Sequence, residues 1–211
     1  MDKAATTAVA VFARAPVAGA SKTRLIPALG EKAAADLHAR MIEHTLKTLA
    51  ALPADHDLQL WCAPHTGHPL FEKLADRYDL SLHTQRGNDL GARMYHALEN
   101  ALLEHDHAIV IGTDCPGIVS ADILAARDAL KGNADVVIGP ADDGGYWLLG
   151  VRKVSATLFT EIAWGSDRVY EQTRQRIDTL GWRSHALQTR TDIDRPEDLA
   201  LVPAHLLEGL A

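Results

Sequence analysis

The sequence has little of what marks disulfide-rich, membrane-spanning or nucleic-acid-binding proteins. Its 211 residues include only two cysteines, Cys62 and Cys115, too few for a disulfide framework and in keeping with a reducing cytoplasm, where we expect the protein. No apolar run is long enough to cross a bilayer, so we expect no membrane span. A formal net charge of -7 opposes contact with nucleic acid, and we expect none. With 47% apolar residues the chain can bury a full core, and we expect 1–211 to form a single domain.

A glycine-rich phosphate loop is also missing. The stretch "PVAGASKT" (16–23) has the spacing of a Walker A loop, but Pro16 and Ser21 stand where the two glycines belong. Proline has no backbone N–H and a fixed φ, so a backbone loop of this spacing cannot wrap a phosphate. The P-loop nucleotide-binding fold is therefore excluded.

Negative charge is absent from one long segment. Residues 3–30 contain no Asp or Glu, although the whole chain is acidic. Three cations, Arg14, Lys22 and Arg24, follow the apolar run 8–13 within this segment. We expect this basic loop to bind an anionic ligand.

Apolar runs that favour strands alternate with segments of helical spacing. The runs lie at 8–13, 58–63, 80–84, 107–112 and 134–139, and the clearest helical pattern covers 31–52. This alternation predicts an α/β fold with a mostly parallel sheet and helices on both faces. Ligands of such sheets bind beyond the carboxyl ends of the strands, so the loops that follow the runs are the candidate site.

Three carboxylates in these loops could hold a magnesium ion. Asp114 comes directly after an apolar strand, and Asp192 and Asp194 have the i, i+2 spacing that puts both side chains on one side of an extended segment. Mg²⁺ binds through one or two carboxylates together with substrate phosphates. The alternative is local: Asp114 could stabilise the turn before Pro116, and Asp194 could cap a terminal helix that starts near Pro196.

The loop "GPADDGGYWLLG" (139–150) joins two acids to two glycines. Asp142 or Asp143 could orient an acceptor hydroxyl or act as a base, and we assign that role to Asp143. Gly144 and Gly145 would let the backbone approach a ligand closely. The alternative is a tight hairpin turn, for which Asp-Gly is a strong signal.

The stretch "QRGNDLGARM" (85–94) places glycines and charged residues at the predicted start of a helix. Free N–H groups and side-chain acceptors there could receive a base or a ribose. The spacing of Gly87 and Gly91 is not that of a dinucleotide-binding fingerprint, and these glycines could serve loop geometry alone. The candidate substrate-binding residues of this stretch are Gln85, Gly87, Asp89 and Arg93.

The remaining unusual residues have weaker patterns. Trp164 either shapes the ligand pocket or packs, and Ser166 is the expected N-cap of a helix. The eleven histidines form no zinc pattern with the two cysteines, and we expect them at the surface. Cys115 is expected to be a small buried thiol.

Taken together, these stretches resemble a bacterial family in order and spacing over nearly the whole chain. They are "FARAPVAGASKTRL", "QRGNDLGARM", "GTDCPG", "GPADDGGYWLLGV", "IAWGSDRV" and "DIDRPEDL". The family is of the glycosyltransferase-A type and is often labelled arsenosugar-biosynthesis glycosyltransferase. It is similar, distantly, to phospholactate guanylyltransferase and other sugar nucleotidyltransferases.

The resemblance implies a nucleotide-diphospho-sugar transferase fold and a set of roles. Lys22 and Arg24 would contact phosphates, with Arg14 beside them, and Asp114 would bind Mg²⁺ or Mn²⁺. Asp192 and Asp194 would complete the metal site. Asp143, Gly144 and Gly145 would line the sugar or acceptor pocket.

One departure from the family pattern keeps a second reaction open. Glycosyltransferases of this fold carry an Asp-x-Asp metal motif, whereas this chain has Thr113-Asp114-Cys115. We favour Mg²⁺-dependent glycosyl transfer from a nucleotide-diphosphate sugar to a small acceptor. The alternatives are nucleotidyl transfer from a nucleoside triphosphate, which releases pyrophosphate, and a non-catalytic nucleotide or sugar-phosphate sensor.

Overall fold

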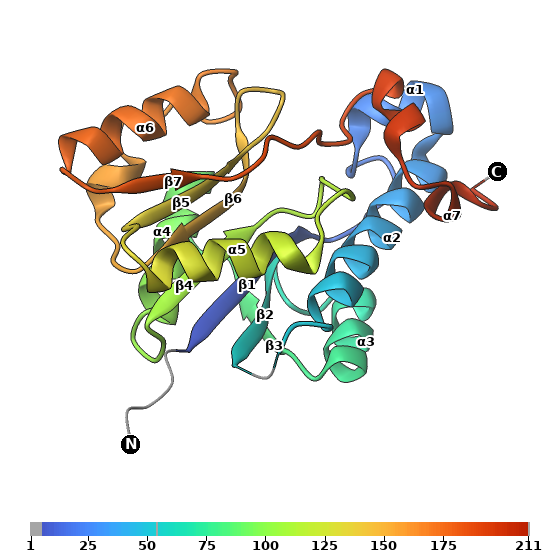
Figure 1. The fold of residues 1–211 in the computed structure, drawn as a ribbon. Coiled ribbons are helices and arrows are strands. Elements are labelled where there is room, and N and C mark those ends of the chain that lie inside the picture. Colours follow the sequence, from blue (N-terminus) through green and yellow to red (C-terminus); the bar gives the residue numbers. More distant parts are fainter. Residues whose placement is uncertain (1–5, 54, 211) are drawn as a thin grey trace.

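The computed structural model describes residues 6–53 and 55–210, which alternate between strands and helices (Figure 1). The strands are β1 (Thr7–Arg14), β2 (His56–Ala63), β3 (Ser81–Thr84), β4 (His107–Ile111), β5 (Val136–Pro140), β6 (Tyr146–Val151) and β7 (Ser184–Ala186). The helices are α1 (Ile26–Leu29), α2 (Glu31–Leu49), α3 (Pro69–Tyr78), α4 (Leu90–Ala101), α5 (Ser120–Lys131), α6 (Val169–Thr179) and α7 (Ala204–Leu207). Three 3₁₀ turns are η1 (Thr23–Leu25), η2 (Ala156–Phe159) and η3 (Pro196–Leu201).

All seven strands join one sheet in the order β3-β2-β1-β4-β6-β5-β7. Strand β6 runs antiparallel to both of its neighbours, and every other pair is parallel. The predicted mostly parallel sheet is confirmed. Its antiparallel member follows from the short connection between β5 and β6, which is too short for a parallel crossover.

Helices cover both faces of the sheet, as expected (Figure 1). Apolar side chains of α2, α3 and α5 pack on one face, and those of α4, η2 and α6 pack on the other. Strand β1 serves both layers because its side chains alternate: Val9 and Val11 face the first layer, Ala8 and Ala10 the second. The sheet is buried between two apolar layers.

Helix α2 is shorter than its sequence pattern. The periodicity predicts a helix over 31–52, whereas α2 ends at Leu49. The N–H of Leu52 bonds to the carbonyl of Leu49 in a turn, directly before Pro53, whose ring disfavours helical backbone in the preceding residue. Among the described residues, no helix has both the length and the apolar character that crossing a membrane would need.

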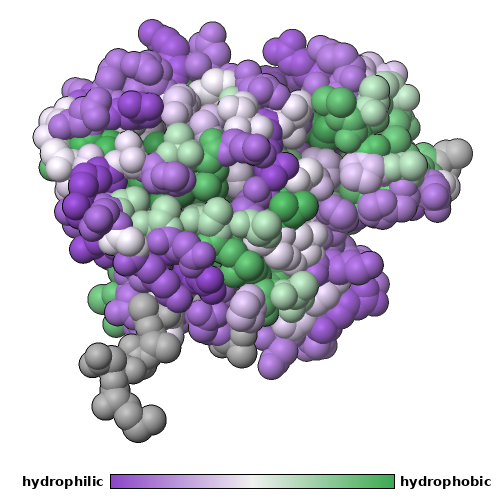
Figure 2. All heavy atoms as spheres, in the orientation of Figure 1, coloured by the Kyte–Doolittle hydropathy of each residue, from purple (hydrophilic) through white to green (hydrophobic). Residues whose placement is uncertain are grey.

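A small third core lies beside the sheet. Leu25, Leu37 and Met41 from the N-terminal part pack against Ile193 and Leu206 from the C-terminal part. The segment that follows β7 crosses to this region in Figure 1, and Figure 2 shows apolar side chains reaching the surface there. This core holds the basic loop next to the segment with the late acidic residues.

Candidate functional site

A cavity of about 380 Å³ opens at the carboxyl ends of the parallel strands. Its walls come from the end of β1, the residues that follow β3 and β4, the β5–β6 loop, and residues 164–166 before α6. The predicted position of the ligand site, beyond the carboxyl ends of the strands, agrees with this cavity.

Three carboxylates line the cavity: Asp114, Asp143 and Asp192. Asp192 is half-buried and makes no ion pair with a described residue. Burial raises the pKa of its carboxyl, and the nearby charges of Asp143, Asp114 and Asp194 raise it further, against a backbone hydrogen bond that lowers it. Asp143 and Asp192 therefore carry charges that no ion pair with a described residue compensates.

Asp194 does not join this group. It does not line the cavity, and its Oδ2 accepts a hydrogen bond from Nη1 of Arg24 in a partly exposed ion pair. Its own N–H donates to Oδ2 of Asp198, which caps η3, so the expected capping role falls to Asp198. In 6–53 and 55–210, no three His, Cys, Asp or Glu side chains are grouped so that they could hold a metal ion as they stand.

Lys22 is buried against the acids rather than exposed to the cavity. Its Nζ lies 2.7 Å from Oδ1 of Asp114 and donates to the carbonyl of Ile193 at 2.5 Å. The Lys22 side chain is only 5% exposed. In this conformation Lys22 and Arg24, both expected on phosphates, neutralise carboxylates instead.

Two other cations do line the cavity, Arg14 and Arg93. Nε of Arg93 donates to the carbonyl of Gly87 at 3.1 Å, which fixes the direction of its guanidinium. Neither arginine forms an ion pair with a described Asp or Glu. Both are therefore placed to bind an anionic ligand.

The stretch 85–94 divides between ligand and loop roles. Gln85 lines the cavity, and its amide N–H₂ donates to the carbonyls of Trp61 (2.8 Å) and Ala13 (3.3 Å), so its amide oxygen is the group left to accept. Asp89 caps α4 by accepting from the N–H of Ala92 at 2.7 Å. Gly87 has φ +144, and a Cβ on it would lie 2.7 Å from that of Ala92. The cap of α4 explains Asp89, and the backbone conformation explains Gly87, without a ligand.

The β5–β6 loop is both a hairpin turn and a wall of the cavity. Asp143 accepts the N–H of Gly145 at 2.8 Å, and both residues line the cavity. A Cβ on Gly144 (φ +86) would lie 2.0 Å from the carbonyl oxygen of Asp167, so only glycine fits there. Asp142 lies outside the cavity and accepts from the hydroxyl of Thr191 at 2.5 Å.

Trp164 has both of its expected roles. Its ring lines the cavity and also packs on α4, where a Cβ on Gly91 would come within 2.4 Å of the ring. The expected N-cap at Ser166 is wrong: α6 starts at Val169, and Oγ of Ser166 donates to the carbonyl of Ala163 in the preceding turn.

His38 lines the cavity although no sequence motif singled it out. The expectation that the histidines lie at the surface is wrong for His38 and His107, each 6% exposed. His38 lines the cavity, and its Nε2 donates to the carbonyl of Arg14 at 3.0 Å. Burial lowers its pKa, which favours the neutral ring. The signal was present in the sequence, because His38 lies four residues before the buried Ile42 on one face of α2.

Cys115 is the buried thiol that was expected. It is 3% exposed, and burial raises the pKa of its thiol, with Asp192 and Asp114 adding to the shift. The thiol therefore stays protonated at neutral pH and is a poor nucleophile.

Distantly similar structures show the fold. A 4-diphosphocytidyl-2C-methyl-D-erythritol synthase from Anaerococcus prevotii is 12% identical, with a TM-score of 0.64 over 97% of this chain and 99% of that one. A glucosyl-3-phosphoglycerate synthase from Mycobacterium tuberculosis, solved with Mn²⁺, UDP and glucosyl-3-phosphoglycerate, is 13% identical, with a TM-score of 0.57 over 98% of this chain and 78% of that one. The fold is the nucleotide-diphospho-sugar transferase fold of the glycosyltransferase-A type.

Closer matches show the family. A protein from Desulfovibrio desulfuricans G20, assigned provisionally as a nucleotide-diphospho-sugar transferase, is 31% identical, with a TM-score of 0.82 over 90% of this chain and 82% of that one. None of the curated protein sequences matches this chain. The family described as "Uncharacterized protein conserved in bacteria (DUF2064)" matches residues 45–166, more than half of the sequence. The chain therefore belongs to the DUF2064 family.

Proposed function

We propose that the protein is a metal-dependent transferase that moves a sugar from a nucleotide-diphosphate sugar to a small acceptor. One observation carries this proposal: Asp114, Asp143 and Asp192 face the same cavity as Arg14 and Arg93. Asp143 and Asp192 form no ion pair with a described residue and would attract a cation. Arg14 and Arg93 form none with a described Asp or Glu and would attract an anion. A nucleotide diphosphate with a divalent metal supplies both. The provisional assignment of the 31% identical relative supports the same reading.

The donor atoms of the cavity suit a hard divalent cation. Carboxylate oxygens are the ligands that Mg²⁺ and Mn²⁺ prefer, and Asp192 forms no ion pair with any residue that the structure describes. We assign Asp143, rather than the predicted Asp194, to the metal site with Asp114 and Asp192, because Asp194 is engaged by Arg24 outside the cavity. The three carboxylates are not grouped closely enough to hold an ion by themselves, so the phosphates of the substrate would supply the remaining ligands. A cation held there would neutralise the charge that develops on the phosphates of the leaving group.

The other residues of the cavity would bind and orient the two substrates. Arg14 and Arg93 contact the diphosphate, and the amide oxygen of Gln85 accepts from the base or the ribose. Gly145 and Trp164 form the wall on the acceptor side. The predicted role of Asp143 as a base toward the acceptor hydroxyl remains a prediction, as do the substrate-binding roles of Gly87, Asp89 and Gly144.

Nucleotidyl transfer is the second candidate. The same groups would neutralise a triphosphate, and the metal motif is a single Asp114 between Thr113 and Cys115 rather than Asp-x-Asp. This reaction expels pyrophosphate instead of a nucleoside diphosphate. The arsenosugar label and the likeness to phospholactate guanylyltransferase remain predictions that no comparison tests.

One assay separates the candidates. The protein is incubated with Mn²⁺ or Mg²⁺ and either nucleotide sugars or nucleoside triphosphates, with small hydroxyl compounds as acceptors, and the released phosphates are followed by ³¹P NMR. We expect a nucleoside diphosphate from a nucleotide sugar. Pyrophosphate from a triphosphate would replace our proposal with nucleotidyl transfer, and tight binding without turnover would indicate a sensor.

Neighbouring acids provide a matched control for this assay. Asp143→Asn changes a carboxylate inside the cavity, whereas Asp142→Asn changes one that contacts Thr191 outside it. Turnover should fall in the first variant and persist in the second. Equal activity in both variants would remove the β5–β6 loop from the site.

A further inference from the structure

Lys22 is an unusual cation because it lies between the two segments that carry the acids. Its Nζ contacts Oδ1 of Asp114, after β4, and the carbonyl of Ile193, between Asp192 and Asp194. The same two segments are joined by the N–H of Ile193, which donates to the carbonyl of Asp114 at 2.8 Å. Lys22 thus adds side-chain contacts to two segments that a backbone hydrogen bond also joins.

The contacts of Lys22 hold its ammonium group in one position. The Lys22 side chain is 5% exposed, while that of Asp114 is 53% exposed and so remains open to ligands. Lys22 also has a left-handed backbone conformation, with φ 48 and ψ 45, which residues other than glycine rarely adopt. Strained residues of this kind persist where the surrounding contacts determine them, and they gather at ligand sites.

Resting on the function proposed above, we propose that Lys22 is the internal counter-ion of the acid cluster and keeps a bare divalent cation from binding tightly. Its ammonium occupies one carboxylate oxygen of Asp114 and repels a second cation beside it. Phosphates that arrive with the metal offer Lys22 another anionic partner and so lift this competition. The protein then takes its nucleotide as a metal complex, and free metal alone occupies the site poorly.

Binding of Mn²⁺ alone, followed by EPR without any nucleotide, tests this directly. Lys22→Gln keeps an N–H donor for the carbonyl of Ile193 but removes the charge, so Mn²⁺ should bind at least about tenfold more tightly than to the wild type. Lys22→Arg keeps the charge and should bind Mn²⁺ as weakly as the wild type. Lys32→Gln removes an exposed lysine on α2 that has no ion pair with a described residue, and it should change nothing.

A residue that serves only to bind phosphate would leave the affinity for bare metal unchanged. If folded Lys22→Gln binds Mn²⁺ no more tightly than the wild type, the proposal is wrong. Circular dichroism checks the fold of the variant.

A second measurement needs only the wild type. Mn²⁺ and inorganic pyrophosphate added together should raise the melting temperature by more than the sum of their separate effects, because each relieves the penalty on the other. Additive shifts would contradict the proposal even if Lys22→Gln fails to fold. Neither measurement needs turnover, so an inactive protein that still shows tightened Mn²⁺ binding in Lys22→Gln would overturn the proposed function and leave the counter-ion role standing.

Discussion

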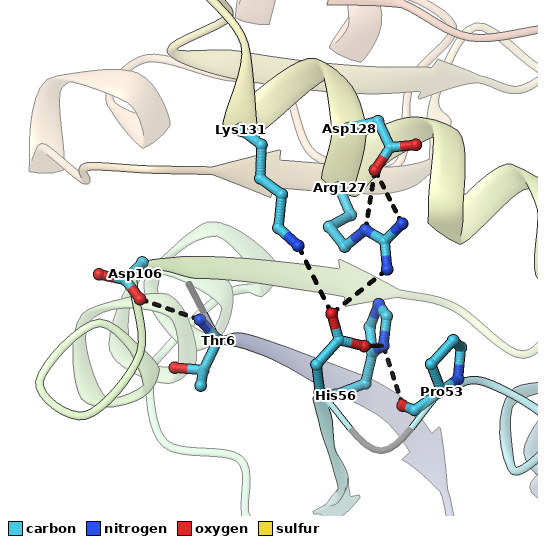
Figure 3. A network of polar contacts seen from close by, with 8 residues as sticks. Thr6, Pro53, His56, Asp106, Arg127, Asp128 and Lys131 are labelled. Carbon is cyan, nitrogen blue, oxygen red and sulfur yellow. Dashed lines mark hydrogen bonds and ion pairs between the residues drawn. The ribbon is translucent and has the colours of Figure 1, made fainter. Parts of the chain in front are cut away.

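Carboxylates at the two ends of the sheet differ in whether cations neutralise them and in the direction of their pKa shifts. At the amino ends of the parallel strands, Oδ2 of Asp55 lies 3.4 Å from both Arg127 and Lys131, and its Oδ1 lies 2.9 Å from Nδ1 of His56 (Figure 3). Burial acts to raise the pKa of Asp55, but His56 and the two cations lower it overall. This acid is compensated by its partners.

Asp135, which precedes β5, is compensated in the same way. Its Oδ2 accepts the N–H of Arg183 at 2.9 Å, and its Oδ1 lies 3.1 Å from Nζ of Lys153. The backbone hydrogen bond from Arg183 lowers its pKa, and Lys153 adds to the shift against the effect of burial. At the carboxyl ends, by contrast, Asp192 has a raised pKa and no ion pair with a cation among the described residues.

The difference in pKa distinguishes acids that stabilise the fold, Asp55 and Asp135, from Asp192, which we propose binds a ligand. At neutral pH, a carboxylate whose pKa is lowered by folding stabilises the folded state, whereas one whose pKa is raised by folding destabilises it. Residues held at such a cost cluster at functional sites. The following predictions test whether the two ends of the sheet differ as described.

The largest effect should be on catalysis. If Asp192 binds the metal as proposed, Asp192→Asn removes one of its ligands while keeping the shape of the side chain, so turnover should fall by about 100-fold or more. Steady-state kinetics with the substrate pair found by the phosphate-release assay measures this, with Asp142→Asn as the control. Full activity of Asp192→Asn would remove the uncompensated acid from the chemistry.

The next effect concerns stability at the amino ends. Asp135→Asn leaves Arg152, Lys153 and Arg183 without their shared acid, so the free energy of unfolding should fall by about 1–2 kcal/mol at neutral pH, because the three cations are themselves 40–60% exposed. Because the folded pKa of Asp135 lies below its ordinary value of 3.8, its contribution is present above that pH and is lost as the pH falls through the folded pKa. Urea unfolding at pH 7 and at pH 3 should show the difference between the variant and the wild type shrinking in acid. A difference that stays constant would contradict this assignment.

The opposite sign is expected at the carboxyl ends. Without metal, Asp192→Asn should stabilise the protein at neutral pH, by less than about 1 kcal/mol because the residue is only partly buried and solvent screens its charge. A raised folded pKa means that the carboxyl contributes stability below 3.8 and loses it as the pH rises through the folded pKa. The melting temperature of the metal-free variant should therefore exceed that of the wild type at pH 7 but not in acid. Destabilisation at neutral pH would place Asp192 with the structural acids.

The smallest effect should come from Asp194. Its ion pair with Arg24 is partly exposed, and such pairs contribute about 0–1 kcal/mol. Asp194→Asn should therefore change both turnover and stability little. A loss of turnover as large as that of Asp192→Asn would restore the metal set of Asp114, Asp192 and Asp194 expected from the sequence.

The sequence predicted the fold and the edge of the sheet at which the cavity lies, because both depend on local patterns. Apolar runs with helical segments between them determine a mostly parallel sheet, and the residues that follow each run lie at its carboxyl edge. Asp114, Asp143 and Arg93 reached the cavity for this reason. The hairpin turn at Asp143-Gly144 could also be predicted, because Asp-Gly is a strong turn signal. The same loop forms a wall of the cavity.

Pairings between distant segments could not be read from the sequence. Lys22 contacts Asp114, and Arg24 contacts Asp194, across 92 and 170 positions, because the third core brings the basic loop against the C-terminal segment. Spacing along the chain says nothing of such contacts. The need for glycine at Gly91, beneath the ring of Trp164, is of the same kind.

Mn²⁺ binding in the presence of a saturating nucleoside diphosphate tests the central claim most directly. Titration calorimetry with UDP, CDP, GDP and ADP in turn should find, for one of them, a single Mn²⁺ site in the wild type. That site should be lost in Asp192→Asn and kept in Asp194→Asn. Equal Mn²⁺ binding by the wild type and Asp192→Asn, or no binding by the wild type with any of the four nucleotides, would contradict the claim that the uncompensated acids of the cavity hold a metal-bound nucleotide.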